Sequence, residues 1–218
     1  MESLENMFSK KYFYIPRAVK PAVFAMVMLV AASPAEAGSC NSAKAYISKV
    51  ANSVTRIVAN TSVGSAVREQ RFRQVFRSNM NIRKLGKFAL GRYARKMPAS
   101  KNATYLKLVE GLVIKVFFSR MKDYRGEKFK IYDTRKGCRA KGSRGREFIV
   151  SGEIKTASGR RVAQISWWVV GSRIFDISVE GVWLAQQQRS AFGSVLRKSN
   201  GDFEALFKNL RTRISRGR

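Results

Sequence analysis

The chain has 218 residues, of which 43 are Lys or Arg, 14 are Asp or Glu and none is His, giving a net charge of +29 at neutral pH. The lack of histidine excludes Ser-His-Asp and Cys-His catalysis and His-ligated metals, and two cysteines are too few for a four-cysteine zinc site. A 45% hydrophobic share is sufficient for a globular core, so the charge indicates a folded protein with an anionic partner, either nucleic acid or a membrane surface.

The N-terminal segment 1–37 has the layout of a secretory signal peptide. A basic stretch between residues 10 and 20 precedes the apolar run 22–32, and the small-residue exit Ala35-Glu36-Ala37 follows. The apolar run is too short for a membrane-spanning helix, which needs about 20 residues. We therefore expect cleavage after Ala37 and export to the periplasm, with a net charge of +28 on the mature chain. In the cell envelope, a membrane surface becomes the better anionic partner.

The two cysteines, Cys40 and Cys138, lie near the expected mature N-terminus and in a later basic loop. An oxidising compartment permits one disulfide between them, and two free thiols are the alternative. A lipidated Cys40 is disfavoured, because Ala37 stands three positions earlier where a Leu is usual.

Apolar residues at three- and four-residue spacing predict helices in the first half of the mature chain. The first covers 43–58, and a shorter basic helix includes 72–76. A third is expected over 84–96, although Gly86 and Gly91 weaken its continuity. A long helix containing 105–118 follows, and its apolar arc is wide enough to be buried on more than one side. It is either a central core helix or a helix that partly lines a ligand cavity.

Beyond residue 126 the apolar period becomes alternating, which predicts strands at 129–131, 148–154, 163–169 and 175–179. Short Gly-containing turns at 157–160 and 171–172 join the later strands, so we expect antiparallel hairpins. The earlier connection, 135–145, is longer and strongly basic.

Two helices, 186–198 and 202–214, close the chain, and Asn200 is the expected N-cap of the last one. Helices, then an antiparallel meander, then helices predict an α+β fold with a roughly four-stranded antiparallel sheet. We expect a single domain over 38–218, with a helical part, 38–97, followed by a helix-sheet-helix part, 98–218.

The acidic residues offer no obvious catalytic arrangement, because the eleven that remain after export are spread along the chain. Gly142-Ser143-Arg144-Gly145 has the GxxG spacing of an RNA-binding module, but that module sets its loop between helices and this one lies between predicted strands. The chain also has no phosphate-binding loop and no dinucleotide fingerprint. We therefore predict a binding protein without a cofactor or a metal, not an enzyme.

One segment resembles a known family. Residues 176–192, DISVEGVWLAQQQRSAF, resemble the D-x-x-V-E-G-V-S-L-x-x-x-Q-R-x-x-F stretch of the MlaC, or toluene-tolerance, family of periplasmic lipid-shuttle proteins. Similar segments precede it in matching order, at 72–76, 85–93 and 124–127. The chain departs from the family pattern at Trp183, where Ser is common, and at 97–100, which lacks the usual acidic S/T-P-E opening.

This resemblance implies helices packed on a curved sheet, with an apolar cavity between them that holds phospholipid acyl chains. It further implies exchange of lipid with an inner-membrane ABC transporter complex, through its lipid-binding ring subunit, and with an outer-membrane lipoprotein assembly. A hopanoid-type polycyclic lipid is the alternative cargo. The rival interpretations are a basic nucleic-acid-binding protein and an enzyme built on the same curved sheet.

Two sets of residues are predicted to form the site. The inward faces of the long helix and the strands are expected to surround the acyl chains with Leu106, Val109, Val113, Phe117, Phe129, Ile131, Trp167, Val169, Ile177 and Val179. Headgroups or an anionic membrane surface are expected to be bound by Arg92, Arg135, Lys136, Arg139, Lys141, Arg144 and Arg146. Nucleic acid is not expected as a partner, because the alternating aromatic residues point inward and do not form exposed stacking platforms.

Overall fold

The computed structural model describes residues 38–120, 124, 126–142 and 145–216. The predicted signal peptide, 1–37, and the predicted docking residue Arg144 lie outside the described residues. The described elements all belong to one compact unit, Glu36–Arg218. Among them, no helix combines the length and the apolarity that crossing a membrane requires.

Among the described residues, four α-helices precede the sheet, at Cys40–Ala59 (α1), Ser65–Asn79 (α2), Ile82–Leu90 (α3) and Ala99–Arg120 (α4). The helix expected over 84–96 is divided at Gly91, whose φ of +55° is left-handed and incompatible with a continuing helix. The chain continues there as a 3-10 helix, Gly91–Arg95. The weak helix continuity predicted from this glycine is therefore a real interruption of the helix.

The strands form one antiparallel sheet of Lys128–Ile131 (β1), Cys138–Ala140 (β2), Glu147–Lys155 (β3), Arg161–Val170 (β4), Arg173–Val179 (β5) and Val182–Trp183 (β6). Its order is β1-β3-β4-β5-β6, and β2 also pairs with β3. The expected hairpins between β3, β4 and β5 are confirmed. The two additional strands are β2, three residues long inside the basic connection, and β6, two residues long; neither is long enough to show an alternating pattern.

Strand β1 pairs with the second half of β3 and approaches it closely at Gly152. A Cβ atom at Gly152 would collide with the carbonyl of Lys130 and the backbone of Ile131. Only glycine allows the two backbones to approach this closely. The α+β class is therefore confirmed, with more strands than the four expected.

Two helices follow the sheet, Leu184–Lys198 (α5) and Phe203–Arg216 (α6). The predicted N-cap of the last helix was wrong. Asp202 is the capping residue, because its carboxylate accepts hydrogen bonds from the backbone N–H groups of Glu204 (2.8 Å) and Ala205 (3.2 Å). Asn200 instead takes a left-handed φ of +52° in the turn before it.

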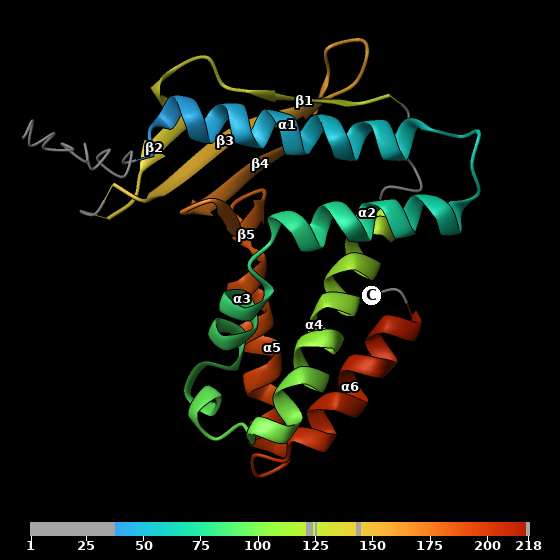
Figure 1. The fold of residues 1–218 in the computed structure, drawn as a ribbon, viewed down its shortest axis with the longest axis vertical. Helices are drawn as coiled ribbons and strands as arrows, with labels where there is room; N and C mark the ends of the chain where they lie inside the picture. Colours follow the sequence, from blue (N-terminus) through green and yellow to red (C-terminus); the bar gives the residue numbers. More distant parts are fainter. Residues whose placement is uncertain (1–37, 121–123, 125, 143–144, 217–218) are drawn as a thin grey trace, which may run out of the picture. The chain divides into compact units, whose positions relative to one another are not determined.

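Different helices pack on different parts of the sheet (Figure 1). Helix α1 lies across one face and contacts β1, β2 and β3. Helices α3 and α5 contact β5, and α4 packs among α2, α3 and α6. We call the sheet face that carries Val150, Ile165 and Trp167 the inner face.

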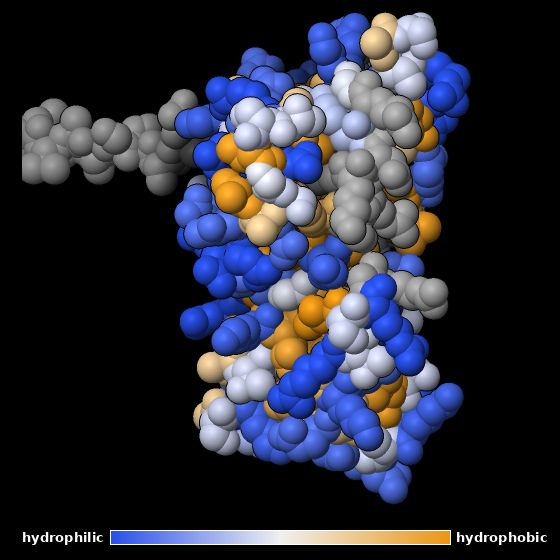
Figure 2. Space-filling view, turned by 90° about the vertical axis from the view of Figure 1, so that its right-hand side faces the viewer, coloured by the Kyte–Doolittle hydropathy of each residue, from blue (hydrophilic) through white to orange (hydrophobic). Residues whose placement is uncertain are grey.

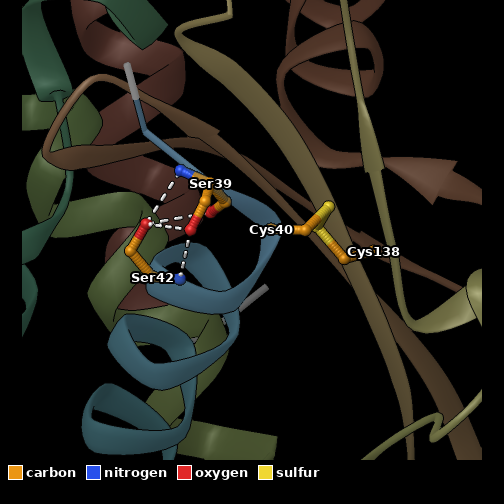
Figure 3. Close-up of a disulfide and its surroundings, with 4 residues drawn as sticks. All are labelled: Ser39, Cys40, Ser42 and Cys138. Carbon is orange, nitrogen blue, oxygen red and sulfur yellow. Dashed lines mark hydrogen bonds between the residues drawn. A yellow bond between two sulfur atoms is a disulfide. The ribbon is translucent and has the colours of Figure 1, made fainter. Parts of the chain in front are cut away.

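A disulfide joins Cys40, the first residue of α1, to Cys138, the first residue of β2 (Figure 3). Beside it, Ser39 and Ser42 form a capping box, with Ser42 N–H donating to Ser39 Oγ (3.1 Å) and Ser39 N–H to Ser42 Oγ (2.9 Å). The bond spans 98 residues of sequence. Closing a loop of roughly 100 residues contributes about 2–5 kcal/mol by restricting the unfolded chain. The start of α1 is thereby held against the sheet.

Candidate functional site

The strand register brings the predicted apolar residues of the sheet onto one face. Trp167 pairs with Val150 on one side and with Ile177 on the other. Ile131 pairs with Gly152, which is followed across the sheet by Ile165 and Val179. Because neighbours across antiparallel strands point to the same side, these rows form a continuous apolar surface.

Burial differs along this inner face. Val169 and Ile177 are buried, and Phe129, Ile131 and Trp167 are half-buried. Val179 shares the inner face with Ile165 but is 38% exposed. It lies at the end of β5, opposite Val182 of β6, the short edge strand of the described sheet.

The predicted site residues of α4 are distributed around that helix. Val109 and Val113 are buried, whereas Leu106 and Phe117 are half-buried. Leu106 lies against α3, since a Cβ atom at Gly86 would be 2.9 Å from Leu106 Cδ2. The wide apolar arc of α4 is explained by neighbours on three sides, α2, α3 and α6. The core-helix alternative therefore accounts for most of this surface.

The inner face is filled by side chains in one hydrophobic core that also includes α1 residues. A groove of about 300 Å³ lies elsewhere, between α1 and α2, lined by Tyr46, Lys49 and Asn79 among others. Another, of about 360 Å³, lies beside Trp183. Neither groove is lined by the inner-face residues Ile165, Trp167 or Ile177.

The predicted basic residues are not brought together. Arg92 is exposed and stacks on Tyr93, with its guanidinium 5.1 Å from the ring centre, in a segment that packs against α5. The other predicted basic residues that the structure describes lie around β2, far from that segment in Figure 1. Four of them are exposed: Arg135, Lys136, Arg139 and Arg146.

Lys141 differs from its basic neighbours, because it is half-buried and its Nζ atom lies 3.5 Å from the centre of the Trp168 ring. Trp168 also meets Phe175 edge-on at 4.8 Å and Trp183 at 6.0 Å. Phe175 in turn carries Lys84 over its ring, at 5.2 Å. This row of rings and cations lies opposite the inner face. Sequence reasoning missed it, although adjacent tryptophans in a strand must point to opposite faces.

A buried carboxylate connects the sheet to α5. Asp176 is 2% exposed and accepts hydrogen bonds from the backbone N–H groups of Ile177 (2.8 Å) and Ala185 (3.0 Å). Burial raises its pKa to about 6, and the two N–H donors and Lys141 act in the opposite direction. Within the described part of the chain, no group of three or more Cys, Asp or Glu side chains is placed to hold a metal ion.

The surface between these features is mostly hydrophilic. Figure 2 shows one face of the molecule, on which apolar patches are separated by strongly hydrophilic residues. The exposed large apolar side chains in the described residues are valines, at 67, 162, 179 and 182. In the described part of the chain, the apolar residues are therefore mainly internal, and the positive charge lies outside them.

Known proteins share this fold. The family model described as "MlaC protein" matches residues 48–212. No match was found among the curated proteins. Among solved structures, the chain is similar to a phospholipid-binding protein from Ralstonia solanacearum in complex with a phospholipid. The two are 15% identical, with a TM-score of 0.67, and the match covers 80% of this chain and 98% of that one. At this identity the likeness shows a common fold.

We predict that Asp176 makes the protein less stable as pH rises from about 4 to about 6. The folded state holds a proton on Asp176 in this range, whereas the unfolded state, with a pKa of 3.8, has lost it. The free energy of unfolding should fall by on the order of 2–3 kcal/mol across this range. Urea unfolding of the natural chain and of Asp176→Asn at pH 4.5 and pH 7 measures the difference.

Exposed Asp133 supplies a matched control, since Asp133→Asn should leave the pH dependence of stability unchanged. The same pH dependence in Asp176→Asn as in the natural chain would show that Asp176 titrates normally in the folded protein.

Proposed function

This chain belongs to the MlaC protein family, and from that premise we propose that it is a periplasmic carrier that holds phospholipid acyl chains against the inner face of its sheet. The observation that supports the proposal most directly is the continuous apolar surface formed by β1, β3, β4 and β5 beneath α1. The phospholipid complex of the similarly folded Ralstonia protein agrees with it.

The energetics of transport explain why such a surface is needed. Two acyl chains with about thirty methylenes cost on the order of 20 kcal/mol to expose to water, at about 0.8 kcal/mol for each methylene. An apolar interior removes most of this cost. Because it does so equally in loading and release, the carrier itself sets no direction. In this proposal the direction comes from the partners, an inner-membrane ABC transporter complex with its ring subunit and an outer-membrane lipoprotein assembly.

The acyl chains need space against the inner face. The disulfide holds the start of α1 to β2, so we place the opening at the other half of the helix. Val54 and Ile57 are only half-buried there and pack on the edge of the core. Phe117, Phe129 and Trp167 are half-buried in the same way. Side chains of this kind can move apart with less loss of packing than fully buried ones.

The side chains of the inner face also disfavour an enzyme. The inner-face positions carry hydrocarbon side chains such as Val150, Ile165 and Ile177. The buried Asp176 is occupied in capping α5. The site therefore offers a place to hold a molecule, without groups arranged to change it.

Docking at a membrane is assigned to the exposed basic residues around β2. Each Lys or Arg near an anionic leaflet contributes roughly 1 kcal/mol, within a Debye length. Arg135, Lys136 and Arg139 are exposed and form no ion pair with the described acidic residues. They are sufficient for transient attachment, whereas Lys141 is already engaged with Trp168.

Lipid extraction tests the carrier function. We expect gently purified protein to contain diacyl phospholipid, near one molecule per chain, when its organic extract is measured by mass spectrometry. Protein from which the lipid has been removed should take up phospholipid from vesicles. A protein that carries no lipid and takes up none from vesicles would refute the proposal.

Charge reversal tests the docking surface. We expect the triple change Arg135→Glu, Lys136→Glu and Arg139→Glu to weaken binding to phosphatidylglycerol vesicles by at least tenfold and to reduce its salt dependence. The matched control reverses three exposed charges on α6, Lys208→Glu, Arg211→Glu and Arg216→Glu. Vesicle co-sedimentation measures both variants. Equal losses in the two variants would mean that only net charge matters and that β2 is not a docking surface.

A further inference from the structure

Two neighbouring tryptophans in β4 have indole N–H groups in opposite situations. Trp168 faces away from the inner face, and its Nε1 donates a hydrogen bond to Glu147 Oε2 at 3.0 Å. Trp167 points to the inner face, and its Nε1 atom is buried without a hydrogen-bond partner among the described residues. One strand therefore carries a satisfied donor on one side and an unsatisfied donor on the other.

The surroundings of Trp167 explain why no acceptor is near. Its cross-strand neighbours on the inner face are Val150 and Ile177, both hydrocarbon. The ring of Phe129 meets the Trp167 ring edge-on, with centres 6.0 Å apart and an angle of 72°. The backbone carbonyls of β3 and β5 lie in ladders with their neighbouring strands, and Ser151 O, for example, accepts from Tyr132 N–H at 3.1 Å. Among the described residues, these inner-face neighbours carry no side-chain atom that can accept the indole proton.

An unsatisfied buried donor is unusual in a folded protein. The indole N–H can only donate, so an acceptor is the single kind of group that would complete it. Most buried polar groups in proteins have a partner, and those that lack one call for a specific reason. Arg68 Nε is also unpartnered in the described residues, but the same guanidinium donates to Val58 O at 3.1 Å and lies on α2, outside the inner face. Trp167 is thus the donor that faces the proposed lipid.

We propose that Trp167 Nε1 donates a hydrogen bond to an ester carbonyl oxygen of the bound phospholipid. This inference rests on the proposed function and names the class of lipid that the site selects. The ester carbonyls of a phospholipid are its polar atoms nearest the acyl chains, and they only accept hydrogen bonds. A saturated polycyclic hydrocarbon offers no acceptor at that depth. Trp167 therefore favours ester-linked diacyl lipid over a hopanoid-type lipid.

The hydrogen bond also fixes how deeply the lipid enters. With the carbonyl held at Trp167, the acyl chains lie along the inner face, and the phosphate remains nearer to solvent. A hydrogen bond formed in a site without water is electrostatically stronger than the same bond formed in water. Its loss leaves the donor buried and unpaired, which is how the site rejects a lipid that lacks the carbonyl.

A pair of lipids that differ only in their two ester carbonyl groups tests the inference. Diacyl phosphatidylglycerol and its dialkyl ether analogue, with the same headgroup and chain length, are compared by displacement of a fluorescent phospholipid. We expect the natural chain to bind the diacyl lipid about fivefold more tightly. Trp167→Phe keeps an aromatic ring but removes the N–H, so it should bind both lipids equally. Trp168→Phe, on the opposite face, should keep the preference.

The outcomes separate this inference from the proposed function. If no variant binds either lipid, the carrier function itself fails. If the natural chain binds both lipids equally, or Trp167→Phe retains the preference, the hydrogen bond is refuted and the carrier function stands. Should Trp167→Phe fold poorly, indole ¹⁵N–¹H spectra of the natural chain supply the test. The Trp167 proton should shift downfield with the diacyl lipid and not with the ether analogue, and identical spectra would refute the inference.

Discussion

The burial of one apolar sheet face beneath α1 is the constraint on which the rest of this structure depends. Val150, Ile165 and Trp167 align across β3 and β4, and β5 continues the surface. Gly152 lets the backbone of β1 approach β3 closely beside this surface. The Cys40–Cys138 disulfide then holds the start of α1 over it. A chain with a net charge of +29 can fold compactly because its apolar and charged residues are separated in this way.

Much of the fold could be predicted from local patterns, and the exceptions have physical reasons. Alternation located β3, β4 and β5, because a half-buried strand leaves a period of two in the sequence. Strand β2 is too short to leave one. Periodicity also shows which residues share a helix face, but not which element covers that face. Leu106 was therefore expected near the lipid and lies against α3.

The candidate site was only partly predictable for the same reason. The inward direction of Trp167 follows from alternation, whereas its unpaired N–H depends on hydrocarbon neighbours supplied by other strands. The contact of Lys141 with Trp168 joins a loop to the opposite side of the sheet. Such contacts arise from tertiary structure, so a list of basic residues could not separate Lys141 from exposed Arg135.

The central claim is that acyl chains lie on the inner face, and photo-crosslinking tests it most directly. The protein is loaded with a phospholipid that carries a diazirine near the end of one acyl chain and is then irradiated. Mass spectrometry of the digested protein identifies the crosslinked residues. We expect adducts at Val150, Ile165 and Trp167, with none at Ser151, Ser166 and Trp168, which alternate with them on the opposite face. Adducts concentrated on the opposite face, or on α6, would contradict the account.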